Sequence, residues 1–114
     1  MASFEDKIRN IVTSLPQTVE QDHHGIPSFR IDGKIFATLW DPTHLNVMLS
    51  PVRIVEVSKE NPKSCREFWW GRRLSCIQVD LETAESRLVK NLLIEAWNRK
   101  KPDGKREKRS VTEN

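Results

Sequence analysis

A basic and aromatic segment at residues 63–73 holds the side chains best suited to binding chemistry in this sequence. Guanidinium groups pair with phosphates, and indole rings stack on unpaired bases or enter grooves, so the mixture is typical of nucleic-acid binding. A second interpretation is an ordinary hairpin with Phe68 and one tryptophan in the core and with solvated arginines. The candidates for nucleic-acid contact in this segment are Arg66, Trp69, Trp70, Arg72 and Arg73.

Two further basic residues flank a turn predicted at Asp32-Gly33. Arg30 precedes this turn and Lys34 follows it, which suggests a second basic wing. Residues 99–109 carry seven basic and two acidic side chains, whereas residues 1–98 carry 12 basic and 13 acidic ones. The net charge of +3 and the pI of 9.1 therefore arise near the end of the chain. Such a segment attracts polyanions without sequence preference, or serves only for solubility.

Histidine and cysteine offer weaker candidates for chemistry. His23 and His24 are adjacent, and Asp22 and His44 join them only if the fold brings these residues together. No cluster at zinc-ligand spacing accompanies them, so we expect neither a metal ion nor a cofactor. A cysteine–histidine nucleophile from Cys65 or Cys76 is formally possible. Because both cysteines fall in predicted strands and not at a helix N-terminus, we expect buried thiols, no disulfide and no enzyme activity.

A predicted hairpin over residues 28–40 is the element around which the rest of the chain is arranged. Two alternating runs, 28–31 and 34–40, meet at Asp32-Gly33, which tolerates the positive φ angles of a two-residue turn. Alternation predicts that Phe29 and Ile31 share one side of the first arm. In the second arm it predicts one face made of Ile35, Ala37 and Leu39 and an opposite face made of Phe36, Thr38 and Trp40.

The other elements follow from apolar periodicity and capping signals. A helix capped by Ser3 runs to Pro16, residues 16–27 are irregular, and residues 45–49 form a third strand. Ser50-Pro51 predicts a helix to about Glu60, although the β-branched content of residues 52–57 leaves a strand as a competitor. Residues 65–70 and 74–81 form a second hairpin, and Thr83 caps a long helix that ends before residues 102–104.

These elements predict an α+β fold with two layers: a five-stranded antiparallel sheet with helices on one face, in the order α-β-β-β-α-β-β-α. The length of 114 residues indicates one domain, residues 1–101, followed by a basic tail, residues 102–114, that we expect to be disordered. No apolar run approaches the ~20 residues of a membrane span, and the first residues lack the pattern of a secretion signal. We therefore expect a cytoplasmic protein without a membrane partner.

Several motifs occur in order along the chain. They are a leucine-proline pair after the first predicted helix (residues 14–16), a glycine-x-proline before an aromatic strand (25–31), a glycine-lysine-x-phenylalanine turn (33–37), and a closing strand (77–81) with a leucine-rich helix (92–97). Together they resemble the MmcQ/YjbR family of small bacterial proteins, and the resemblance covers residues 4 to about 101. It implies a secretion-chaperone-like α+β fold and a DNA-binding role through a proposed double-wing motif, with no established reaction.

The sequence therefore leads to two hypotheses about function. The first is a non-enzymatic DNA-binding module that uses the second hairpin, with help from the tail and from Arg30 and Lys34. The alternative is a protein-interaction or chaperone-like module that uses an exposed sheet face or strand edge. In either case we expect a monomer or a weak dimer.

Overall fold

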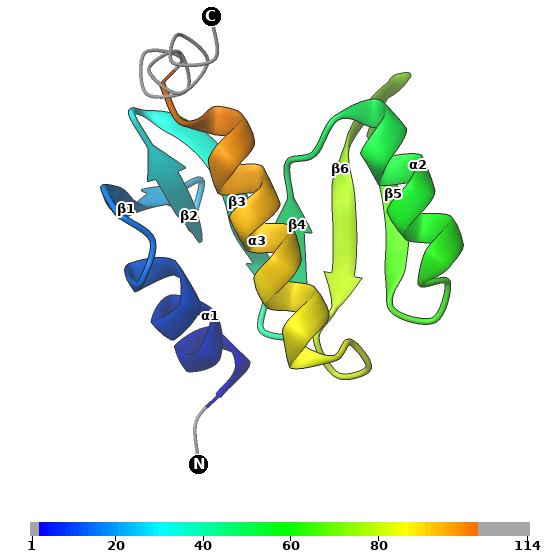
Figure 1. The fold of residues 1–114 in the computed structure, drawn as a ribbon, viewed down its shortest axis with the longest axis horizontal. Coiled ribbons are helices and arrows are strands. Elements are labelled where there is room, and N and C mark those ends of the chain that lie inside the picture. Colours follow the sequence, from blue (N-terminus) through cyan, green and yellow to red (C-terminus); the bar gives the residue numbers. More distant parts are fainter. Residues whose placement is uncertain (1–2, 103–114) are drawn as a thin grey trace, which may run out of the picture.

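The structure, a computed structural model, describes residues 3–102 as three helices and one sheet of six strands. Neighbouring strands are all antiparallel, and their spatial order is β1-β2-β3-β4-β6-β5 (Figure 1). The predicted α+β class is confirmed, but the predicted number of five strands was one too low. The elements are α1 (Phe4–Thr13), β1 (Thr18–His23), β2 (Ile26–Ile31), β3 (Lys34–Asp41), β4 (His44–Val47), α2 (Pro51–Glu60), β5 (Cys65–Trp70), β6 (Arg73–Asp80) and α3 (Ser86–Lys100).

The additional strand is β1, in the segment predicted to be irregular. It pairs with β2 along its whole length, and His24 and Gly25, with φ of 54° and 87°, form the two-residue turn between them. Positive φ at both central residues matches the twist of a tight hairpin. As an edge strand with mostly exposed side chains, β1 contains Val19 as its only large aliphatic residue. Hydrophobic alternation therefore could not reveal it.

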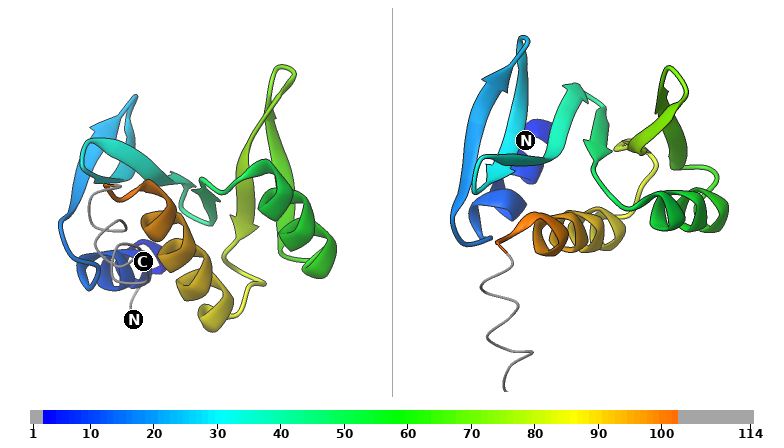
Figure 2. Two further views of the ribbon diagram at one scale, coloured as in Figure 1. Left: turned by 45° about the horizontal axis from the view of Figure 1, so that its top comes forward. Right: turned by 90° about the horizontal axis from the view of Figure 1, so that it is seen from above.

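The three helices lie on one side of the sheet and leave the other side uncovered (Figure 2). α3 packs on β3 and β4, α2 packs on β5 and β6, and α1 packs on α3 and β1. The core lies between these layers, as predicted for a two-layer fold. Its largest fully buried side chains are Phe29, Phe36, Ile8, Ile31, Leu45, Ile54, Ile77 and Leu93.

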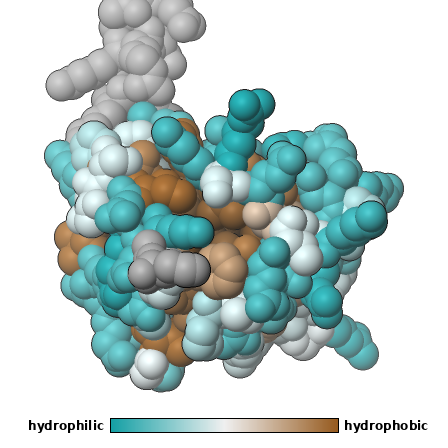
Figure 3. Space-filling view, turned by 90° about the horizontal axis from the view of Figure 1, so that it is seen from below, coloured by the Kyte–Doolittle hydropathy of each residue, from teal (hydrophilic) through white to brown (hydrophobic). Residues whose placement is uncertain are grey.

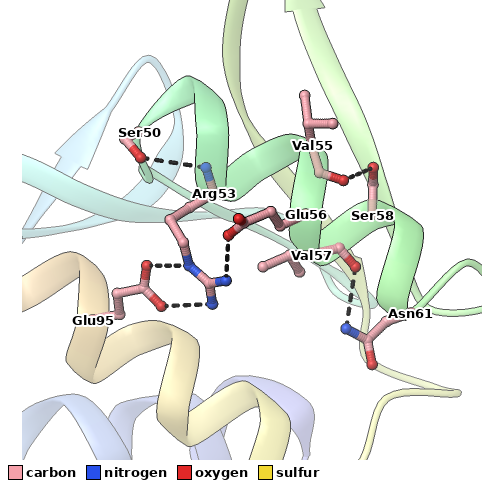
Figure 4. A network of polar contacts seen from close by, with 8 residues as sticks. All are labelled: Ser50, Arg53, Val55, Glu56, Val57, Ser58, Asn61 and Glu95. Carbon is pink, nitrogen blue, oxygen red and sulfur yellow. Dashed lines mark hydrogen bonds and ion pairs between the residues drawn. The ribbon is translucent and has the colours of Figure 1, made fainter.

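Two side-chain interactions fix α2 in place, and its predicted bounds are confirmed. The Ser50 hydroxyl caps the helix by accepting a hydrogen bond from the Arg53 backbone N–H at 3.3 Å. The Arg53 guanidinium then reaches α3, where it donates to both carboxylate oxygens of Glu95, at 2.8 and 3.1 Å, and it also bonds Glu56 (Figure 4). This bidentate pair links the two helices that cover the two halves of the sheet.

A β-bulge in β3 corrects the predicted assignment of faces. Phe29 pairs with Ala37 while Arg30 pairs with Ile35, so Phe36 is an extra residue in the ladder. Phe36 therefore joins Ala37 in the core instead of facing away from it. Ile35 moves to the uncovered side with Thr38 and Trp40.

The start of α3 also differs from the prediction. Thr83 does not cap the helix, which begins three residues later at Ser86. The Thr83 hydroxyl instead lies 3.0 Å from the Ser64 hydroxyl, so it holds the loop after β6 against the loop before β5. Within residues 3–102 no helix has both the length and the apolar content needed to cross a membrane. The predicted disorder of the tail falls on residues that, from 103 onward, lie outside the described part of the chain.

Candidate functional site

The uncovered side of the sheet holds a hollow between two hairpins. The β1–β2 and β5–β6 hairpins both rise from the sheet on the side away from the helices, with the middle strands between them (Figure 2). The hollow measures about 300 Å³, within the range of roughly 300–1,000 Å³ typical of small-ligand sites. It is lined by His23, His24, Ile26, Ile35, Thr38, Trp40, Asn46, Met48, Phe68, Trp70, Ser75 and Cys76.

A row of polar residues crosses the sheet at this hollow. In successive strands the paired residues are Gln21, Ser28, Thr38, Asn46, Gln78 and Arg66. Ser28, Thr38 and Asn46 are buried although they lie on the side without helices. The Gln78 side-chain amide donates to Asn46 Oδ1 at 3.0 Å, and the Ser28 hydroxyl donates to the Gln21 carbonyl at 2.8 Å. Thr38 and Asn46 of this row line the hollow, so its floor offers two polar side chains among the apolar ones of Ile35, Met48 and Cys76.

Aromatic rings form the walls above this floor. Trp40 and Phe68 meet edge to face with their ring centres 5.3 Å apart, which joins β3 to the β5–β6 hairpin across the hollow. Trp40 remains 43% exposed and Trp70 71% exposed. Trp69 points to the other side of β5, where its indole N–H donates to the Glu67 carboxylate at 3.0 Å and its ring is 52% exposed. Trp69 and Trp70 thus lie on opposite faces, as neighbouring residues of a strand do, and neither is in the core.

A group of basic residues, here called the basic cluster, lies beside the hollow and consists of Lys34, Arg73, Arg99 and Lys100. Arg73, Arg99 and Lys100 line a cavity of about 460 Å³. Partial burial and then the positive charges of Arg99, Lys34 and Arg73 lower the pKa of Lys100. The cluster is therefore a region of concentrated positive charge, and a bound anion would reduce the repulsion among its side chains.

The topology of the sheet explains why these residues meet. β3 and β6 are both antiparallel to β4, so they run in the same direction. The turns that precede them, Asp32-Gly33 and Gly71-Arg72, consequently lie at the same end of the sheet (Figure 1). α3 finishes at that end as well. The two predicted basic turns thus share one end of the sheet, where Lys34 and Arg73 both act on Lys100.

The remaining predicted residues are more dispersed. Arg72 is exposed in the turn between β5 and β6, close to Arg73 in sequence. Arg66 is exposed on edge strand β5, at the end of the polar row. Arg30 is half-buried, and its Nε donates a hydrogen bond to the Ser28 hydroxyl at 3.1 Å. It therefore bonds a residue of the polar row. The seven candidates therefore do not form a single patch. Lys34, Arg72 and Arg73 lie at the basic end of the sheet, and the others lie along strands β2 and β5.

His23, His24 and Cys76 all line the hollow, so it contains the two residue types from which a cysteine–histidine nucleophile is built. Cys76, however, is 1% exposed, and burial raises the pKa of its thiol to about 12. Burial likewise raises the pKa of Cys65, on the helix side, to about 11. Both are free thiols, as predicted. A thiol at such a pKa remains protonated near neutral pH and is a poor nucleophile.

The fold does not place His23, His24 and His44 around a common metal site. His44 lies in a hydrogen-bonded group with Asp41 and Thr43, at 2.9 Å from the Asp41 carboxylate. His23 and His24 contact each other edge to face. Among residues 3–102 no group of three or more His, Cys, Asp or Glu side chains is placed to hold a metal ion.

A smaller hollow of about 150 Å³ lies on the helix side, between α1 and the start of α3. Its lining is mainly apolar, and Figure 3 shows the end of the molecule where these helices begin, with apolar atoms visible among hydrophilic ones. Lys7 and Ser86 are the polar side chains among its lining residues. It therefore lacks the grouped charge of the basic cluster and the hydrogen-bonding capacity of the polar row.

Sequence reasoning missed the part of the site that comes from β1, β3 and β4. Alternation predicts the face on which Trp40 lies but not that Trp40 forms a wall of the hollow. Asn46 lies inside a predicted strand, where its type alone indicates no role. An available signal was the presence of large apolar residues on both faces of residues 34–40, which indicates that neither face is simply solvent. The hollow itself depends on sheet twist and on the bulge, which sequence patterns do not reveal.

The comparisons with known proteins agree with this fold. The family model described as YjbR matches residues 13–99. The chain belongs to the YjbR family. A similar solved structure is Deinococcus radiodurans protein DR2400, with family-model domain DUF419: 20% of residues are identical, the match covers 85% of this chain and 77% of that one, and the TM-score is 0.70. No curated protein matches.

The predicted YjbR membership is thus confirmed. At 20% identity, the likeness to the Deinococcus protein extends to the fold of this YjbR domain and not to its ligand. What this member of the family binds must be argued from its own hollow and basic cluster.

Proposed function

We propose that this YjbR domain is a non-enzymatic DNA-binding module. The observation that supports the proposal is the basic cluster, in which Lys34, Arg73 and Lys100 come from three separate segments to one end of the sheet. Positive charges placed this close repel one another, and phosphate groups would neutralise that repulsion. Binding would release counterions from the DNA, so affinity would fall steeply as the salt concentration rises.

The two turns at this end act as wings that contact the sugar–phosphate backbone. Lys34 follows the first turn, and Arg72 and Arg73 lie at the second. Backbone contacts of this kind position a protein on DNA without reading its sequence. Trp70 flanks the second wing on the side of the hollow, where it adds stacking or groove contacts, whereas Trp69 lies on the opposite side and bonds Glu67. Arg66 extends the contact along edge strand β5.

A binding role fits the chemistry of the site better than catalysis. The buried Cys76 thiol has its pKa raised to about 12, and no hydrogen bond joins it to His23 or His24 among the contacts of the described residues. Nucleophilic catalysis needs an activated thiolate next to a base. The site instead combines exposed cations with exposed aromatic rings, which bind a ligand without forming or breaking covalent bonds.

A charge-matched pair of double variants tests the proposal. Lys34→Ala with Arg73→Ala removes two positive charges from the basic cluster, and Lys63→Ala with Lys90→Ala removes two exposed positive charges elsewhere. Fluorescence anisotropy with duplex and single-stranded DNA at several salt concentrations gives the affinity and its salt slope. The cluster variant should bind more weakly, with a slope reduced by up to about 2, while the control stays close to the parent.

Two results would contradict a DNA-binding role. One is the absence of binding to either DNA at low salt. The other is an equal loss in both double variants, because the attraction would then reflect net charge and not the cluster. Circular dichroism of each variant confirms that the fold is retained.

A second candidate is a protein-interaction module, favoured by the exposed edge strands of the sheet. β1 and β5 have one unpaired edge each, and an extended segment of another protein can add to such an edge. A pull-down from cell extract with and without nuclease distinguishes the two functions. A single protein partner that survives nuclease treatment would favour the second.

A further inference from the structure

The aromatic hollow and the basic cavity are adjacent parts of one surface. Met48 and Ser75 line both of them, so the two spaces meet just after β4 and near the start of β6, where the basic cavity continues toward the start of α2 and the end of α3. One space has aromatic walls and two polar residues, Thr38 and Asn46, in its floor, and the other is lined by Arg73, Arg99 and Lys100. An aromatic-walled recess next to a cationic recess matches the two halves of a nucleotide, a planar base and a charged phosphate.

We propose, on the basis of the function proposed above, that the hollow takes an unpaired base of single-stranded DNA while the basic cluster holds the neighbouring phosphates. Trp70 and Trp40 keep exposed ring surface in the hollow, and a base has two flat faces to place against them. The strand then follows the end of the sheet from the hollow toward Arg73 and Lys100.

The geometry favours an unpaired base over a base pair. The recess lies between two raised hairpins, and its lining includes residues from both tips, His24 and Trp70. A base stacked within a duplex cannot enter such a recess unless it leaves the helix, which costs unstacking and unpairing energy. A single strand presents its bases without that cost. The polar side chains of Thr38 and Asn46 line the floor, where the hydrogen-bonding edge of a base would lie.

The first test uses the full chain and two oligonucleotides that differ only in their bases. An oligothymidylate and an abasic oligonucleotide of equal length carry the same phosphates, so the basic cluster and every other basic segment meet the same charge on both. Anisotropy titrations at one salt concentration should show binding to the abasic strand about tenfold weaker, the expected loss when one stacked base is missing.

The second test compares the two exposed tryptophans of β5. Trp70→Ala removes a wall of the hollow, whereas Trp69→Ala removes a ring of similar exposure on the opposite side of the same strand. Trp70→Ala should reduce the affinity for oligothymidylate about tenfold and bring it close to that of the abasic strand. Trp69→Ala should preserve the difference between the two oligonucleotides.

The outcomes separate this inference from the proposed function. If both oligonucleotides bind equally well and with the same salt slope, no base enters the hollow and the inference is wrong, while phosphate binding stands. If neither binds at low salt, the proposed function fails first. If Trp69→Ala abolishes the preference and Trp70→Ala does not, the base lies on the helix side and the hollow is not its site. Should the Trp70 variant not fold, the comparison of oligonucleotides on the parent chain still decides.

Discussion

The two faces of the sheet are made by the same strands and differ in almost every property. On the helix side the inward residues are apolar and buried, among them Phe29, Leu45 and Ile77. On the uncovered side the residues next to them in sequence form a polar row beneath exposed rings. Alternation along a strand separates these sets by a single residue. One sheet therefore supplies stability with one face and presents polar groups and exposed rings on the other.

This contrast implies that the two faces tolerate change differently. A residue packed between two layers loses both its transfer free energy and its contacts when it is truncated. A ring on the uncovered face loses little, because it already contacts water. Stability measurements should therefore respond most to the helix side, and binding measurements to the exposed rings of the uncovered side.

The largest expected difference is between Phe36→Ala and Trp70→Ala. Phe36 is fully buried at the bulge in β3, so its truncation should lower the free energy of unfolding by about 3–5 kcal/mol. Trp70 is mostly exposed, so its truncation should cost about 0.5 kcal/mol or less. Urea denaturation followed by circular dichroism measures both. Similar losses in the two variants would mean that the uncovered face is part of the core.

The core face was largely predictable from the sequence because its signals are local. Ser50-Pro51 gave the start of α2, and Asp32-Gly33 gave the β2–β3 turn with φ of 53° and 76°. The assignment of Phe36 was wrong because a bulge shifts the alternation by one residue without a mark in the sequence. β1 was missed because an exposed edge strand needs few apolar residues. Its turn at His24-Gly25 was the available sign.

The uncovered face was less predictable because it is assembled from distant segments. The arginines and tryptophans of residues 66–73 were identified from their types alone. Their relation to Lys34 and Lys100 depends on strand direction and on where α3 ends. The polar row depends on register, which is fixed only once all six strands are paired. Residue type thus indicated what the site could bind, and topology determined where.

A moderate effect is expected from Asn46→Ala in the polar row. Asn46 is 3% exposed and accepts the hydrogen bond of the Gln78 amide, so removing it leaves a partly buried donor without its partner. Such a loss costs about 1–3 kcal/mol of unfolding free energy. Asn91→Ala, at an exposed position of α3, is the matched control and should stay within about 0.5 kcal/mol of the parent. A neutral Asn46 variant would show that the row is solvated and not buried.

The smallest effect concerns the ion pair that ties the edge strand β1 to the helix layer. Arg9 of α1 donates to both carboxylate oxygens of Glu20, at 2.8 and 2.7 Å. These hydrogen bonds lower the pKa of Glu20 below its ordinary value. A carboxylate whose pKa is lower in the folded state stabilises the fold above its unfolded pKa, and this contribution disappears as the pH falls through the folded pKa.

Glu20→Gln should therefore cost stability at neutral pH and little at low pH. The pair is partly exposed to solvent, so its contribution is limited to about 0.5–1 kcal/mol and shrinks further in high salt. Urea denaturation of the parent and the variant at several acidic pH values measures the difference in their free energies of unfolding. Glu82→Gln, at an exposed position in the loop after β6, provides the control and should follow the parent at every pH. A gap that stays constant with pH would show that Glu20 acts through packing, and that β1 is held to the helix layer without help from charge.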